Sequence, residues 1–277
     1  CLSDWSSDVC SSDLQNHSAW LRAISKFDGA ICISKAVADD LTAWQTEQNI
    51  DFKDRRSFRI NWFHLGADVG SSSPSQGLPD NAEWTLRQLR ARPSFLMVGT
   101  IEPRKGYLQA IDAFSQLWSE GAEINLVIVG KEGWKGLPEM ARRDIPTTIE
   151  RLRSHSELNR RLYFLEGISD EYLEKVYGAS TCLIAASYGE GFGLPLVEAA
   201  QHDLPILARD IPVFREVAGE NAYFFQAEED SSGLTSAVQT WLQLYEGQSH
   251  PKSDAMHWLT WKESSEKMLS GILPVDA

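Results

Sequence analysis

From Pro93 onward, short and fully apolar segments alternate with longer segments in which apolar residues recur every three or four positions. The first kind predicts strands buried on both faces, and the second predicts amphipathic helices. The predicted strands are 94–98, 125–129, 161–165, 181–185 and 205–208. The predicted helices are 106–119, 148–155, 170–177 and 194–201. This alternation predicts an α/β fold with a doubly wound parallel sheet of the nucleotide-binding type.

The chain before Pro93 is less regular. It predicts a strand at 30–34, a helix at 35–48 and a second strand at 58–64, followed by a Gly-, Ser- and Pro-rich linker at 70–80. Residues 1–14, CLSDWSSDVCSSDL, form a near-repeat of Ser and Asp without helical or strand periodicity, and they resemble a translated adapter sequence. We therefore expect a foreign or disordered leader there.

Composition narrows the function classes. The 277 residues carry 39 acidic and 26 basic side chains, a formal net charge of −13 that argues against broad binding to nucleic acid. The 4 cysteines form no CxxC pair, the 6 histidines are scattered and no Asp-x-Asp occurs, so no metal site is expected and a cytoplasmic location is the default. An anionic ligand must then be held by a local basic pocket.

The loop after the first regular strand offers such a pocket. In VGTIEPRKG, residues 98–106, the strand ends near Gly99 and the next helix is expected to begin at about Gly106. Arg104 and Lys105 stand beside that helix N-terminus, where free N–H groups and the helix dipole favour an anion. The pair suits a diphosphate, although this segment taken alone is better explained by an ordinary solvated Arg-Lys pair at a helix start.

A second loop precedes the helix at 194–201 and reads SYGEGFGLPLVE from Ser187 to Glu198. Gly191 and Gly193 allow the backbone to approach a ligand closely, and the N–H groups up to Leu194 can point at an anion or at sugar hydroxyls. Glu190 and Glu198 can each accept hydrogen bonds from vicinal hydroxyls. Each glutamate taken singly is an ordinary surface residue, so the combination carries the signal.

A dinucleotide-binding reading must be weighed against this one. Gly189, Gly191 and Gly193 follow a strand, and Asp210 lies where a ribose-binding acid would be expected. The G-x-G-x-x-G/A pattern nevertheless fails, because Leu194 or Leu196 occupies its last position. An NAD-dependent oxidoreductase therefore remains only a weak alternative.

Together the two loops resemble glycosyltransferase family 4, whose fold is the two-domain GT-B type. Glu190 and Glu198 match the family's E-x7-E motif within GEGFGLPLVEA, and Arg104 and Lys105 match its diphosphate-binding pair. The resemblance implies retaining, metal-independent transfer of a hexosyl group from a nucleotide sugar. Glu190, Arg104 and Lys105 would serve catalysis, with Glu190 on the donor sugar, and Glu198 would hold the ribose.

The resemblance also implies further donor-binding positions. The chain departs from many members at Thr100, where they have an arginine, which leaves the positive charge to Arg104 and Lys105. The expected donor-binding residues besides Glu198 are Gly99, Thr100, Gly130, Lys131, Ile168, Ser169, Gly191, Phe192, Gly193 and Leu194. Of these, Gly130, Lys131, Ile168 and Ser169 are equally well read as structural loop residues.

The resemblance divides the chain into a leader at 1–14, an acceptor-domain remnant with linker at 15–85, a nucleotide-sugar domain at 86–255 and a returning C-terminal helix at 256–277. It favours mannosyl- or rhamnosyltransferases of O-antigen or polysaccharide synthesis, with GDP-mannose as the first donor guess. The implied acceptor is a glycan or lipid-linked glycan at the inner membrane face, reached by peripheral contact through the missing N-terminal domain. A non-catalytic nucleotide-sugar-binding fragment remains an alternative, and we expect donor binding with weak or absent turnover.

Overall fold

The computed structural model describes residues 11–49, 58–68, 77–226 and 230–272. The chain forms two compact units. The larger consists of Val69–Tyr188 and Leu194–Met256, and the smaller of Cys1–Asp68, Gly189–Gly193 and His257–Ala277. Each unit is described by itself.

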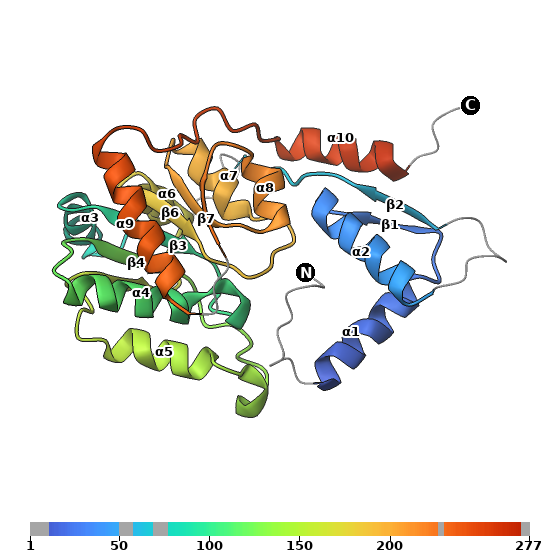
Figure 1. The fold of residues 1–277 in the computed structure, drawn as a ribbon, viewed down its shortest axis with the longest axis horizontal. Helices are drawn as coiled ribbons and strands as arrows, with labels where there is room; N and C mark the ends of the chain where they lie inside the picture. The colour runs from blue at the N-terminus through green and yellow to red at the C-terminus, as the bar shows by residue number, and fades with distance from the viewer. Residues whose placement is uncertain (1–10, 50–57, 69–76, 227–229, 273–277) are drawn as a thin grey trace. The chain divides into compact units, whose positions relative to one another are not determined.

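The larger unit contains a six-stranded parallel sheet in the order β5-β4-β3-β6-β7-β8 (Figure 1). The strands are β3 (Ser94–Val98), β4 (Asn125–Val129), β5 (Leu162–Leu165), β6 (Cys182–Ala185), β7 (Ile206–Arg209) and β8 (Tyr223–Phe225). From β3 the chain adds β4 and β5 on one side, and it then crosses back to add β6 on the other side of β3. The order of the strands therefore reverses between β3 and β6. This is the predicted doubly wound architecture, in which ligands bind beyond the carboxyl ends of the strands near that reversal.

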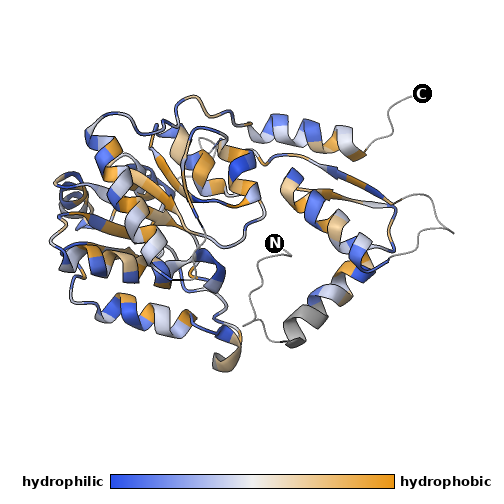
Figure 2. Ribbon diagram, viewed as in Figure 1, coloured by the Kyte–Doolittle hydropathy of each residue, from blue (hydrophilic) through white to orange (hydrophobic). Residues whose placement is uncertain are grey.

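Helices cover both faces of this sheet. One face packs on α4 (Tyr107–Ser119), α5 (Ile145–Ser154) and α9 (Ser232–Glu246), whose apolar residues share one buried cluster with the strands. The remaining helices are α3 (Ala82–Arg90), α6 (Asp170–Tyr177), α7 (Leu194–Gln201) and α8 (Pro212–Ala218). Figure 2 shows polar and apolar residues alternating along α4 and α9. Phe95 of β3 belongs to this buried cluster, and its ring centroid lies 5.5 Å from that of Phe114 and 5.4 Å from that of Trp241.

The smaller unit pairs β1 (Gly29–Cys32) in parallel with β2 (Arg59–Trp62). Its helices are α1 (Ser11–Ile24), α2 (Lys35–Glu47) and α10 (Trp261–Ile272). Leu41 and Trp44 of α2 are buried in a small apolar cluster with Leu21 of α1. The Ser34 side chain caps α2 by accepting from the Val37 N–H at 3.2 Å.

The observed elements agree with the sequence predictions within a few residues, with some differences. Helices α1, α3, α8 and α9 and strand β8 were not predicted. Helix α1 begins at Ser11, so residues 11–14 of the expected leader are helical, while residues 1–10 and most of the predicted linker lie outside the described residues. The C-terminal helix begins only at Trp261, because Thr260 and Glu263 form a capping box that fixes its start.

Candidate functional site

The loops that follow β3, β4, β5 and β6 meet at one edge of the sheet, since the carboxyl ends of parallel strands lie together. In the larger unit this edge carries Gly99 and Thr100 after β3, Gly130 and Lys131 after β4, and Ile168 and Ser169 after β5. The sheet therefore brings most of the predicted donor-binding positions to one edge.

Gly99 lies under the Lys105 side chain. A Cβ built on Gly99 would stand 3.5 Å from the Lys105 Nζ, so the ammonium group lies directly over this residue at the end of β3. The backbone there has φ +145°, and the Gly99 carbonyl accepts a hydrogen bond from the Tyr107 hydroxyl at 2.7 Å. The structure thus brings together Gly99 and Lys105, as the diphosphate hypothesis requires.

Arg104 and Lys105 lie in a short 3-10 turn, Pro103–Lys105, directly before α4, which begins at Tyr107. The two elements are separated because Gly106 adopts φ +72°, and a Cβ at that position would lie 2.5 Å from the Ala186 carbonyl oxygen. The Arg104 guanidinium is paired with the Glu102 carboxylate at 3.0 Å. Glu102 therefore offsets part of the positive charge that the sequence analysis assigned to this loop.

Gly130 packs against the backbone of the β3 loop. A Cβ on Gly130 would lie 2.0 Å from the Gly99 carbonyl oxygen, a distance that no side chain can occupy. The next residue, Lys131, is exposed, and its Cε lies 3.3 Å from the position of a Cβ on Gly167. Gly130 is therefore required by the packing of the two loops, and Lys131 places a second ammonium-bearing side chain at this edge.

The Ser169 hydroxyl has a structural role. Its oxygen caps α6 by accepting from the Tyr172 N–H at 3.2 Å, and the hydroxyl donates to the Gly77 carbonyl at 2.7 Å. Ile168 before it is half-buried. These two bonds use the hydroxyl's donor and one of its two acceptor sites.

Glu198 of α7 has a partner that the sequence analysis did not identify. The Tyr177 hydroxyl donates a hydrogen bond to Glu198 Oε2 at 2.6 Å, and the Tyr177 ring stacks on His202 with centroids 5.1 Å apart. Burial and the neighbouring Glu198 carboxylate raise the pKa of Tyr177 well above its usual value. Tyr177 therefore stays protonated and holds one carboxylate oxygen of Glu198 in place.

Replacing Tyr177 with Phe should weaken nucleotide binding about threefold to tenfold. The substitution removes a hydrogen bond to a carboxylate, which is worth about 1.5 kcal/mol or more, and part of that loss falls on nucleotide binding. Calorimetric titration with a nucleoside diphosphate measures the change. Tyr163→Phe is the control, since the Tyr163 hydroxyl also donates a single bond, to the Arg160 carbonyl at 3.0 Å. Equal affinities for Tyr177→Phe and the parent chain would contradict the assignment of Glu198 to the ribose.

The glycine-rich segment Gly189–Gly193 belongs to the smaller unit. The Ser34 hydroxyl donates to the Gly191 carbonyl at 2.7 Å, and the Phe192 ring lies 5.3 Å from His64. Glu190 retains only 9% of its exposed surface, so it is not the ordinary surface residue that its position alone suggested. Glu190 and Glu198 are thus assigned to different units, Glu198 being in the larger one.

Asp210 does not support the dinucleotide-binding alternative. Arg215 donates two hydrogen bonds to its carboxylate, each at 2.7 Å, and Gln226 donates another at 3.1 Å. The Arg215 hydrogen bonds lower the pKa of Asp210 below its usual value. The Asp210 carboxylate is thus hydrogen-bonded to side chains of its own unit.

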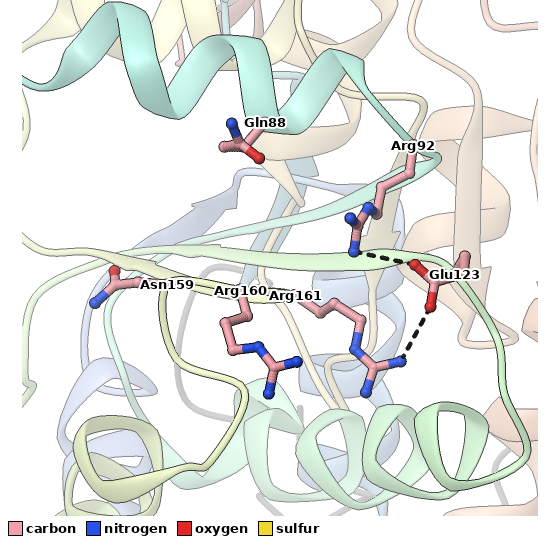
Figure 3. Close-up of a pocket in the computed structure, with 6 residues that line it drawn as sticks. All are labelled: Gln88, Arg92, Glu123, Asn159, Arg160 and Arg161. Carbon is pink, nitrogen blue, oxygen red and sulfur yellow. Dashed lines mark ion pairs between the residues drawn. The ribbon is translucent and has the colours of Figure 1, made fainter.

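A cavity of about 400 Å³ lies at the opposite, amino-terminal edge of the sheet. Its lining residues are Gln88, Arg92, Glu123, Asn159, Arg160 and Arg161 (Figure 3). Glu123 lies between Arg92 at 3.3 Å and Arg161 at 3.7 Å, and Arg161 also pairs with Glu157 at 2.8 Å. Because carboxylates of the same unit already engage two of these arginines, and because the donor loops lie at the other edge, this cavity is not the candidate donor site.

Within the part of the chain that the structure describes, no group of three or more His, Cys, Asp or Glu side chains is placed to hold a metal ion. None of the helices described is both long and apolar enough to cross a membrane. The described cysteines, Cys32 and Cys182, are both buried thiols.

The parallel sheet and the helices on its two faces define an α/β protein with a doubly wound sheet, and comparison with known proteins identifies the family. Residues 85–258 match the family described as glycosyl transferases group 1, and the chain belongs to this family. It is 48% identical over 259 residues to the serotype-specific mannosyltransferase WbdA of Escherichia coli, covering 93% of this chain and 30% of WbdA. It is also 29% identical over 150 residues to the O-antigen chain mannosyltransferase RfbU of Salmonella typhimurium, covering 54% of this chain and 38% of RfbU.

Solved structures support the same fold. Sucrose-phosphate synthase from Thermosynechococcus elongatus has a TM-score of 0.66 at 19% identity, covering 93% of this chain and 60% of that one. HepE from Anabaena, in complex with UDP and glucose, also has a TM-score of 0.66, at 17% identity, covering 93% of this chain and 66% of that one. The predicted GT-B type fold and glycosyltransferase membership are both confirmed. The chain spans about a third of the length of WbdA.

Proposed function

We propose that this chain binds a nucleotide diphosphate sugar, with GDP-mannose as donor, and that the mannosyl group passes to a glycan hydroxyl with retention of configuration. The observation that carries the donor site is the Lys105 ammonium lying over Gly99 at the carboxyl end of β3. The choice of mannose rests on the identity with WbdA and RfbU, which are named as mannosyltransferases.

The chemistry follows from charge development. As the bond between the anomeric carbon and the diphosphate oxygen breaks, negative charge grows on the leaving diphosphate. Lys105 and Arg104 are preorganised beside the diphosphate, and their positive charges stabilise this negative charge in place of a metal ion. The acceptor oxygen attacks from the face that the diphosphate leaves, and the acceptor proton passes to a diphosphate oxygen. Retention of configuration follows from this geometry.

The two glutamates have separate tasks in this proposal. Glu198, held by Tyr177, binds the ribose hydroxyls through its other oxygen. Glu190 contacts the donor sugar, and Gly191, Phe192, Gly193 and Leu194 line the donor site around it. Gly99, Thr100, Gly130 and Lys131 complete the phosphate side.

The acceptor in this proposal is a growing polysaccharide such as an O-antigen, carried on a lipid-linked glycan. The reaction then takes place in the cytoplasm, where the nucleotide sugar is available, at the inner face of the cell membrane. The choice of an O-antigen rests on the similarity to O-antigen chain mannosyltransferases. The lipid-linked carrier and the place of the reaction are what the resemblance to glycosyltransferase family 4 implies.

Sugar transfer tests the proposal directly. The chain is incubated with GDP-mannose or UDP-glucose and a synthetic mannoside acceptor, and binding and product are measured side by side. We expect GDP-mannose to bind more tightly than UDP-glucose and any product to keep the donor's anomeric configuration. Inverted product, or preference for UDP-glucose, would contradict the proposal. GDP-mannose binding without product would favour the alternative of a non-catalytic donor-binding chain.

A further inference from the structure

Arg209 is a fully buried arginine, with 0% of its surface exposed, at the last position of β7. It therefore lies at the carboxyl edge of the sheet, where the candidate donor loops are. Burying a guanidinium is costly unless other groups compensate its charge and satisfy its donors. The groups that contact the Arg209 guanidinium therefore indicate its role in the fold.

Those partners belong to the segment between β6 and the glycine-rich loop. Arg209 Nε donates to the Ala186 carbonyl at 3.0 Å, and the guanidinium lies 4.0 Å from the centroid of the Tyr188 ring. A planar cation stacked on an aromatic face and bonded at its edge fixes both the position and the tilt of that ring. The Arg209 side chain thus contacts both ends of the segment 186–188 and holds it in place.

The guanidinium is itself fixed from the other side. Arg209 Nη2 donates to Gln109 Oε1 of α4, and the Gln109 amide donates in turn to the Asp230 carbonyl at 2.6 Å. The Phe225 ring lies 5.1 Å from the guanidinium carbon. Arg209 therefore contacts Gln109 of α4 and Phe225 of β8 directly, and Gln109 extends the connection to the segment before α9.

The segment 186–188 also supports the turn that carries the two basic residues. The Tyr188 N–H donates to the Arg104 carbonyl at 2.8 Å, and the Ala186 carbonyl lies so close to Gly106 that a Cβ there would be 2.5 Å away. The backbone on both sides of Lys105 therefore rests on residues that Arg209 holds.

We propose that Arg209 is a positioning residue for diphosphate binding. It acts through Ala186 and Tyr188 to fix the turn that presents Arg104 and Lys105, and it does not touch the ligand. This inference rests on the proposed function for its ligand, but the ordering of the loop can be measured without any ligand.

The test compares Arg209→Lys with the parent chain. Lysine keeps the charge but loses the planar face and the edge donor of the guanidinium. The matched control is Arg215→Lys, because Arg215 also stacks on an aromatic ring, Phe224 at 3.8 Å, but is exposed on α8. Hydrogen exchange of the residue 188 amide is followed by NMR beside the amides of β6, and affinities for GDP and GMP are measured by calorimetry.

We expect Arg209→Lys to speed exchange of the residue 188 amide at least tenfold while the β6 amides change less than twofold. The dissociation constant for GDP should rise tenfold or more, and that for GMP less than threefold, since the loss falls on the second phosphate. Arg215→Lys should change none of these values by more than twofold. A purely structural role would lower the unfolding temperature without separating GDP from GMP.

Unchanged exchange at residue 188, or faster exchange with unchanged GDP affinity, would overturn the inference. If the parent chain binds no nucleoside diphosphate, the proposed function fails, and the exchange measurement alone then decides whether Arg209 orders the loop. Should Arg209→Lys not fold, Tyr188→Ala removes the stacked ring and leaves the Arg209 hydrogen bonds intact. The same pattern of exchange and affinity is expected for that variant.

Discussion

Replacing Lys105 with Ala should weaken GDP binding by a factor of roughly 10 to 150, which corresponds to about 1.5–3 kcal/mol for a lost charge-assisted bond. The expected size follows from the position of the ammonium over Gly99, where it faces the end of β3 and the backbone of the phosphate loop. Calorimetry with GDP measures the change, and GMP titrated in parallel should lose much less.

Lys175→Ala is the matched control for this variant. Lys175 is an exposed lysine in the last turn of α6, which runs back from the carboxyl edge of the sheet. Its removal changes the net charge of the chain by the same amount and should change GDP affinity less than twofold. Similar losses in both variants would mean that Lys105 acts only through the overall charge, and the phosphate site would lose its support.

Replacing Gly130 with Ala should lower the free energy of unfolding by about 3 kcal/mol and abolish most GDP binding. The added Cβ would lie 2.0 Å from the Gly99 carbonyl oxygen, so the β3 and β4 loops must move apart. Since both contacting groups are backbone or attached directly to it, neither can rotate away as a flexible side chain would. Urea denaturation measures the loss of stability.

Gly136→Ala controls for the loss of a glycine in the same loop region, because a Cβ at Gly136 meets nothing within 4 Å. That variant should match the parent chain within about 0.5 kcal/mol, the usual range for surface substitutions. An unfolding free energy for Gly130→Ala equal to that of Gly136→Ala would contradict the close packing of the two loops.

Strands β3 to β7 of the larger unit could be predicted because they are buried and therefore appear as continuous apolar runs, whereas β8 was not predicted. The bounds of β3 and β4 match those expected from the sequence. Helix α9 was not predicted, although Leu234, Val238 and Trp241 recur at helical spacing and all are fully buried. That signal was present in the sequence.

The details of the candidate site depend on contacts between distant parts of the chain, and local patterns carry no information about them. Tyr177 reaches Glu198 from a different helix, and Arg209 reaches Gln109 across the sheet. The attachment of the glycine-rich segment to Ser34 likewise joins residues 157 positions apart. The motifs therefore predicted the residues of the candidate site, but they did not predict the side chains that hold those residues in place.

Calorimetric titration of the parent chain with GDP, GMP and NAD measures whether the carboxyl edge of the sheet receives a nucleoside diphosphate. We expect saturable binding of GDP at one site, at least tenfold tighter than GMP, with no comparable binding of NAD. Tight NAD binding with no response to GDP, or equal affinities for GDP and GMP, would contradict it.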